Sequence, residues 1–289
     1  MMQQYEWTPN SLATAMFAAR FAVQEHDTID PSLSQAILPW GAKLSKQITN
    51  AQAWDDTVAL AILTTDPAWL SEQIVKQNPP NILSADSNIP DLIRQLHNVA
   101  LQHFPRFEND ILIRIQPMKL QWEAVGPGLI KSACRSLNLL VPSQIKIALI
   151  WPLQGGSVTP VIGQDQLALE AVLTNSHPAI PEVLRLGWGV LQLGMPAFAW
   201  NEHRILAQTV CAMAILQAAE DLDLVCFEPE TLAAAATTWR LPWISTREQD
   251  LLDWWRANQH KSQIDIRSLA DADTSPTLLK IESFLQDSR

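Results

Sequence analysis

Residues 170–194, EAVLTNSHPAIPEVLRLGWGVLQLG, decide the fold, because they lead from a strand-like segment into the most apolar helical pattern of the chain. Pro178 and Pro181 lack a backbone N–H, and two prolines three residues apart are tolerated in a helix only in its first turn. Gly194, with a proline two residues later, is typical of a helix end. The stretch therefore predicts a helix over 178–193.

The faces of this predicted helix are unequal. Apolar side chains cover most of its circumference, which indicates a buried helix. The exceptions are Glu182, Arg185 and Gln192, whose spacing places them on one narrow stripe. Gly187 and Gly189 each destabilise a helix interior by about 1 kcal/mol relative to alanine. We therefore expect another segment to approach the helix backbone closely at these glycines.

The polar stripe has two interpretations. In the first, Glu182 and Arg185 form an i,i+3 pair, or pair with neighbouring segments, on a thin solvent-facing stripe. In the second, the stripe floors a cleft, with Glu182 and His177 at its mouth and Glu170 on the preceding strand. A histidine at the head of the next helix would then approach His177. The candidate binding residues are Glu170, His177, Glu182, Arg185, Gln192 and His203.

Four segments alternate apolar and polar residues or are short and apolar, which favours strands. They are DILIRIQP (110–117), QIKIALIW (144–151), VTPVI (158–162) and QLALEAVL (166–173). Pro160 confines the third to an edge or a bulge. A helix of about three turns, over 126–137, is expected between the first two.

The rest of the chain is typical of helices joined by loops. Asp55 and Asp56 precede a short apolar segment, and Asp66 with Pro67 matches a helix N-cap followed by proline. The predicted helices lie at 11–24, 57–65, 67–76, 90–103, 203–220, 229–239 and 246–258, with a short one at 276–286.

These patterns predict an α+β (mixed α/β) fold, with a small central four-stranded sheet in a predominantly helical envelope. The expected regions are an N-terminal helical region over 1–108, an α/β core with the buried helix over 109–240, and a C-terminal helical extension and tail over 241–289.

Composition excludes several functions. The chain has 289 residues, 47% hydrophobic and 17% charged, which is enough for a sizeable core. Its net charge of −10 argues against binding nucleic-acid phosphates or anionic membranes. We find no signal peptide and no apolar run long enough to span a bilayer. Twelve tryptophans, scattered along the chain, are expected to anchor the core.

The three cysteines show no pattern of a metal site or a disulfide. Cys134, Cys211 and Cys226 lack CxxC spacing and lie in mainly apolar contexts, so we expect free, buried thiols. Their odd number fits a reducing compartment, and the protein is expected to be cytoplasmic.

The order of the predicted elements resembles that of zincin metallopeptidases, in which strands, including an edge strand, precede a central helix. That helix carries H-E-x-x-H, with two zinc-binding histidines and a glutamate that activates water. Here the segment is PEVLRLGWGV, without histidine, and Arg185 would repel a cation. The resemblance therefore concerns topology, and we predict no metal and no cofactor.

Two functions are compatible with the sequence. The first is a non-catalytic cytoplasmic protein that binds a protein or small-molecule partner, with no nucleic acid and no membrane. The alternative is a hydrolase or metal-dependent enzyme with a zincin-like topology but no H-E-x-x-H motif, acting through Glu170, His177, Glu182 and His203.

Overall fold

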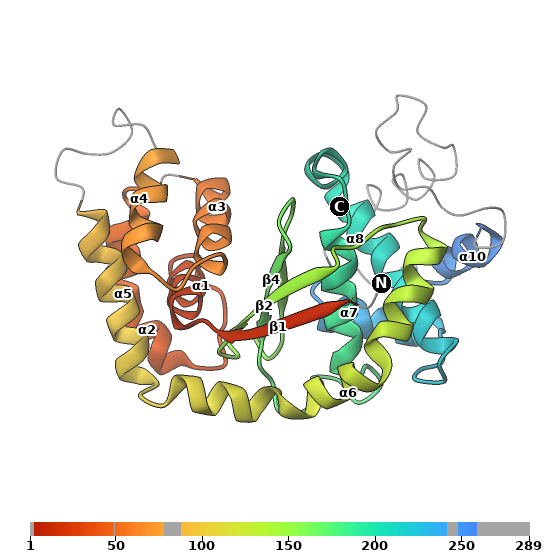
Figure 1. Ribbon diagram of the computed structural model, residues 1–289. Coiled ribbons are helices and arrows are strands. Elements are labelled where there is room, and N and C mark those ends of the chain that lie inside the picture. The colour runs from red at the N-terminus through yellow and green to blue at the C-terminus, as the bar shows by residue number, and fades with distance from the viewer. Residues whose placement is uncertain (1–2, 49, 78–87, 242–247, 259–289) are drawn as a thin grey trace.

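The computed structural model describes residues 3–48, 50–77, 88–241 and 248–258 (Figure 1), with the side chains of 197–202 left out. It is mostly helical with a four-stranded mixed sheet, which confirms the predicted fold class. Within this part of the chain, no helix is both long enough and apolar enough to cross a membrane.

The sheet has the strand order β1-β2-β4-β3. β1 (Gln4–Pro9), β2 (Gln144–Ile150) and β4 (Gln166–Glu170) run parallel, and β3 (Val158–Val161) lies antiparallel to β4 at the edge. Three of the predicted strands are therefore confirmed. Pro160 lies in the edge strand, as its missing N–H requires.

The strand predicted at 110–117 is wrong, because this segment is the first part of α6 (Phe107–Ser136). Ile111 and Ile115 are buried whereas Ile113 is 66% exposed, so the burial repeats every four residues and not every two. The helix predicted at 126–137 is the last part of α6. The fourth strand is β1, which sequence reasoning did not predict.

The helices form two groups on opposite sides of the sheet (Figure 1). One group comprises α1 (Ser11–Val23), α2 (Pro31–Ser45), α3 (Ala51–Ile62), α4 (Pro67–Gln77) and α5 (Ile89–His103). The other comprises α7 (Glu182–Leu193), α8 (Ala197–Glu220), α9 (Pro229–Thr238) and α10 (Glu248–Asn258). α6 runs from the first group to the second along the bottom of the view.

Helix starts follow the capping residues. Asp66 accepts a hydrogen bond from the Ala68 N–H (2.8 Å) at the start of α4, as predicted. The predicted start of the preceding helix is wrong: Asn50 caps α3, and Asp55 and Asp56 lie within this helix.

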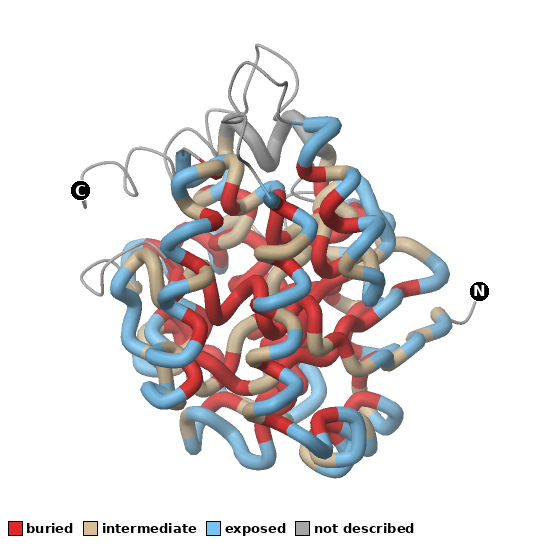
Figure 2. The backbone as a smooth tube through the Cα atoms, turned by 90° about the vertical axis from the view of Figure 1, so that its left-hand side faces the viewer, coloured by how far each residue is buried: buried red, intermediate tan, exposed pale blue. Residues whose placement is uncertain are grey.

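Buried residues are concentrated in the interior of the molecule (Figure 2), and α1, β2, β4, α7 and α8 contribute many of them. Several tryptophans anchor it, including Trp122 and Trp255, and Trp188 stacks on Trp239 with ring centroids 5.4 Å apart. All three cysteines are free. The predicted burial is confirmed for Cys211, whereas Cys134 is only partly buried and Cys226 is exposed, so the predicted burial of Cys226 is wrong.

The three predicted regions remain a prediction. β1 belongs to the sheet although it lies in the region expected to be helical. The short helix predicted at 276–286, and most of the loop before α5, lie outside the described residues.

Candidate functional site

Helix α7 begins later than predicted. It starts at Glu182, with Pro181 as its N-cap residue, because residues 177–180 form a bridged turn between His177 and Ile180. Its end before Gly194 is as predicted, and every residue of α7 is buried.

The stripe on α7 contains an ion pair. The Arg185 guanidinium pairs with the Glu182 carboxylate, so the predicted i,i+3 pair is confirmed. The predicted solvent exposure is wrong, because the two side chains are only 1% and 4% exposed. Helices α6 and α8 and strands β3 and β4 pack around α7 and exclude water from the stripe.

Glu170, at the end of β4, lies beside the same pair. Its carboxylate accepts hydrogen bonds from the N–H groups of Gln154 (3.0 Å) and Gly156 (2.7 Å). Burial raises the pKa of the Glu170 carboxyl, although the Arg185 guanidinium and the N–H groups of the turn oppose the rise. Burial likewise lowers the pKa of Arg185, against the opposing effect of Glu182 and then Glu170.

We call the group formed by Glu170, Glu182 and Arg185 the buried charge cluster. This cluster holds two loops in place. The Ser176 N–H donates to Glu182 (2.7 Å), which fixes the loop between β4 and α7. Arg185 lies against the turn between β2 and β3. A Cβ on Gly156 would stand 1.8 Å from Arg185 Nη1, so only glycine allows the guanidinium this place.

The cluster is not placed to act on a substrate. Its carboxylates are bound to backbone N–H groups and to the guanidinium, and its members are almost completely buried. Among the described atoms, Arg185 Nε and Nη1 have no hydrogen-bond partner. We interpret the cluster as a structural element that joins α7 to the two loops.

The other three candidate residues have different surroundings. His177 Nδ1 accepts from the Ala179 N–H (3.2 Å) within its own turn. His203 lies at a kink in α8, with non-helical backbone angles (φ −127, ψ 34). Gln192 is buried and donates to the Trp188 carbonyl (3.1 Å). The described contacts therefore bring together Glu170, Glu182 and Arg185.

The close approach expected at the two glycines of α7 is confirmed. A Cβ on Gly189 would stand 2.4 Å from the Val158 side chain of β3. A Cβ on Gly187 would stand 2.9 Å from Leu129 of α6. The glycines allow a strand and a helix to pack directly on the α7 backbone.

Two cavities lie near these elements. One, of about 280 Å³, borders Glu182 and is otherwise lined by α6 and the loop before α7. The other, of about 430 Å³, lies along β3, and we name it the β3 cleft. Its lining comprises Arg20, Gln52, Asp55, Asp56, Val58, Ala59, residues 158–162, Arg204 and Gln208.

The β3 cleft carries charges of both signs. Arg20 pairs with Asp55 (2.5 Å), and Asp56 accepts a hydrogen bond from Gln52 (2.8 Å). No described side chain pairs with Arg204. Sequence reasoning missed this site because its residues come from four distant elements, and the adjacent acids at 55 and 56 were interpreted as a helix start.

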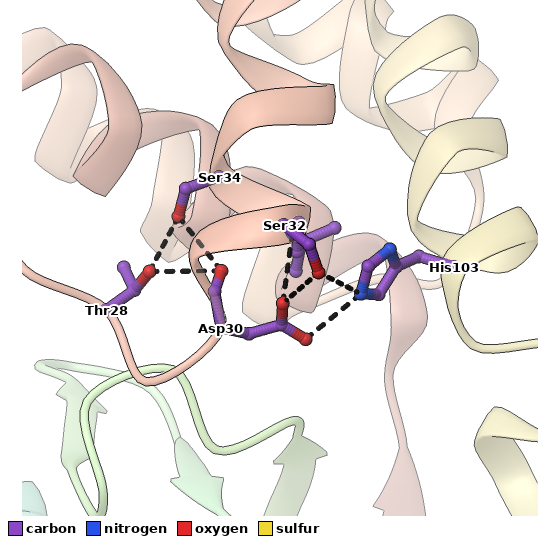
Figure 3. Close-up of polar contacts among 6 residues, drawn as sticks. Thr28, Asp30, Ser32, Ser34 and His103 are labelled. Carbon is purple, nitrogen blue, oxygen red and sulfur yellow. Dashed lines mark hydrogen bonds and ion pairs between the residues drawn. The ribbon is translucent and has the colours of Figure 1, made fainter.

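A third polar group joins α2 to α5 (Figure 3). Asp30 accepts from the Ser32 hydroxyl (2.7 Å) and the Leu33 N–H (3.0 Å), and His103 Nε2 contacts its other oxygen (3.0 Å). The Ser32 hydroxyl lies 3.4 Å from the same Nε2. A catalytic triad needs the serine and the acid on different ring nitrogens. This group is therefore a helix cap tied to a histidine.

Comparisons with known proteins give no match, whether to a protein-family model, to a curated protein or to a solved structure. The element order that resembled zincins included the strand at 110–117, which is wrong. Strand β1 now stands first, separated from β2 by six helices within the described residues. Within the same residues, no three or more His, Cys, Asp or Glu side chains are grouped so that they could hold a metal ion.

Proposed function

We propose that the protein is a non-catalytic ligand-binding protein and that its ligand occupies the β3 cleft. The observation that carries this proposal is a cavity of about 430 Å³ lined by two arginines, two aspartates and an edge strand. Ligand sites in proteins are concave and typically enclose 300–1,000 Å³, with a few polar groups that fix the ligand.

The contacts of the cleft support binding more than catalysis. Arg20 and Asp55 neutralise each other, and the described lining of the cleft holds no histidine, cysteine or lysine that could activate the Thr159 hydroxyl or act as a nucleophile itself. In the alternative function, a hydrolase or metal-dependent enzyme, Glu170 and Glu182 would act on a substrate together with His177 and His203. Both carboxylates are instead bound within the buried charge cluster.

The compartment is part of the same proposal. An odd number of free cysteines is compatible with a reducing environment, so we propose that the protein acts in the cytoplasm on a cytoplasmic ligand.

The proposal is tested by a ligand screen recorded on backbone amide resonances. The probes are four mixtures: amino acids with short peptides, nucleotides, sugars, and organic acids. We expect at least one mixture to shift the amides of residues 158–162. Ala59→Trp, which fills the cleft, should abolish the shift, whereas Ala124→Trp on the exposed face of α6 should preserve it.

Two results would contradict the proposal. One is a set of mixtures that shifts only amides outside the cleft. The other is a compound in these mixtures that the protein converts to product at a rate that Ala59→Trp abolishes, because the cleft would then be an active site.

A further inference from the structure

We infer that the ligand of the β3 cleft is a short peptide with a free amino terminus and a free carboxyl terminus. This inference rests on the proposed function and specifies its ligand. It is carried by the opposite charges on the two sides of β3 and by the main-chain groups between them.

The first step is the charge that remains after internal pairing. Arg20 and Asp55 form an ion pair, so together they add no net charge to the cleft. Asp56 contacts only the neutral Gln52 amide among the described residues, and Arg204 has no described partner. One carboxylate and one guanidinium are therefore left to bind a ligand that carries both signs of charge.

The second step is the position of these two charges. Asp56 belongs to α3 and Arg204 to α8, and these helices lie on opposite sides of the sheet (Figure 1). Both side chains nevertheless line one cavity together with β3. A ligand that reaches both must cross the edge of this strand, with its cationic end towards α3 and its anionic end towards α8.

The third step concerns the main chain of β3. The Glu170 N–H donates to the Ser157 carbonyl (3.0 Å), and hydrogen-bonded pairs alternate along an antiparallel ladder. Thr159 and Val161 therefore bond to β4, whereas Val158 and Pro160 direct their main-chain groups to the free edge. This edge offers two carbonyls and, because proline has no N–H, the single Val158 N–H.

Such an edge is complementary to a peptide amide. An N–H between the two charged ends of a ligand can donate to a β3 carbonyl, and addition of an extended peptide to a sheet edge is a general mode of recognition. The proline limits the number of hydrogen bonds, which favours a short peptide over a long added strand. A free amino acid has both charges but no amide between them.

The test is an NMR titration with three probes: trialanine, N-acetyl-trialanine and trialanine amide. We expect trialanine to shift the amides of residues 158–162, and each blocked peptide to bind about tenfold more weakly, since a hydrogen bond to a charged group contributes about 1.5 kcal/mol or more. Arg204→Gln should weaken trialanine about tenfold and abolish the difference between trialanine and its amide. Asp56→Asn should do the same for the acetylated peptide.

The controls are Arg135→Gln and Asp27→Asn, which remove exposed charges of the same kinds elsewhere and should leave trialanine binding unchanged. Equal binding of all three peptides would overturn the inference, as would an Arg204→Gln variant that still distinguishes the amide. If trialanine fails while another mixture shifts the cleft amides, the peptide inference falls and the proposed function stands. If no probe shifts these amides, both fall.

Discussion

Replacing Arg185 with methionine should strongly destabilise the protein. Methionine keeps much of the side-chain length but leaves Glu170 and Glu182 in a buried site without a counter-charge. Removal of one partner from a buried ion pair typically costs about 3–5 kcal/mol, against under about 1 kcal/mol at the surface. Because Arg185 and Glu182 are 1% and 4% exposed, we expect the larger value.

Removing the acidic partner, Glu182, should destabilise the protein less than removing Arg185. After Glu182→Gln, Arg185 still has the Glu170 carboxylate as a neighbouring charge, so the guanidinium is not isolated. The assay is urea unfolding of Arg185→Met, Glu182→Gln and the double variant, which gives a coupling energy from a double-mutant cycle. Arg135→Met, at an exposed site, is the matched control and should change the free energy of unfolding by no more than about 0.5 kcal/mol.

The pH dependence provides an independent readout of the same cluster. Burial raises the pKa of Glu170 in the folded protein, so its contribution to stability is present below its unfolded pKa of about 4.3 and is lost as pH rises. Without Arg185 this effect should increase, so Arg185→Met should be less destabilising at pH 5 than at pH 8. A coupling energy near zero, together with a destabilisation independent of pH, would refute the reasoning.

Three further predictions follow from packing, thiol exposure and capping. Gly189→Ala should destabilise the protein in thermal unfolding, because the new Cβ would clash with the Val158 side chain. Gly128→Ala is the control: its Cβ would meet no atom nearer than 3.9 Å, so this change should stabilise the protein by up to about 1 kcal/mol. Equal effects of the two changes would contradict the packing at Gly189. Iodoacetamide should label the exposed Cys226 well before Cys211, because Cys211 is buried and burial raises the pKa of its thiol. Non-reducing mass spectrometry should find no disulfide. Rapid labelling of both thiols would contradict the burial of Cys211. Desolvation tends to raise the pKa of Asp30, but hydrogen bonding outweighs it and lowers this pKa. The ionised Asp30 carboxylate therefore stabilises the folded protein above its unfolded pKa of about 3.9, and this stabilisation is lost as pH falls through the folded pKa. Asp30→Asn should therefore flatten the acid limb of the stability profile, and an unchanged limb would argue against this cap.

The predictability of α7 from sequence depended on local signals. Its end at Gly194, its burial and the close approach at Gly189 all follow from residue types within a single helix. The exposure of the Glu182–Arg185 stripe could not be predicted, because it depends on which distant elements cover the helix. The start was misplaced because a proline pair is compatible with a helix turn and also with a bridged turn before it.

The first part of α6 shows why alternation alone is ambiguous. Ile111 and Ile115 lie on one face in a strand and also in a helix, since four residues are a multiple of two and close to one helical turn. Only Ile113 distinguishes the two, and it is exposed. β1 was missed for the complementary reason: exposed and half-buried residues alternate along it, so it has no strongly apolar face, and it is recognised by its pairing with β2.

The β3 cleft could not be predicted from any local pattern. Asp56 and Arg204 are ordinary exposed residues on two helices, and neither stands in a motif. They come to line the same cavity only in the folded protein, where the sheet lies between the two helix groups (Figure 1) and its edge strand β3 lies beside both residues. Only Pro160 gave a sequence signal near this site, since it identified β3 as an edge.

The buried charge cluster and the β3 cleft are physically connected even though the cluster touches no ligand. An edge strand has a hydrogen-bonding neighbour on one side only, so its position depends on how its ends are held. The Glu170 carboxylate accepts hydrogen bonds from N–H groups of the turn that leads into β3, and Arg185 lies against Gly156 of that turn. On the other face, Gly189 allows Val158 to pack on the α7 backbone. The polar stripe, for which the sequence allowed a solvent-facing pair or the floor of a cleft, therefore holds the strand whose free edge lines the proposed binding site.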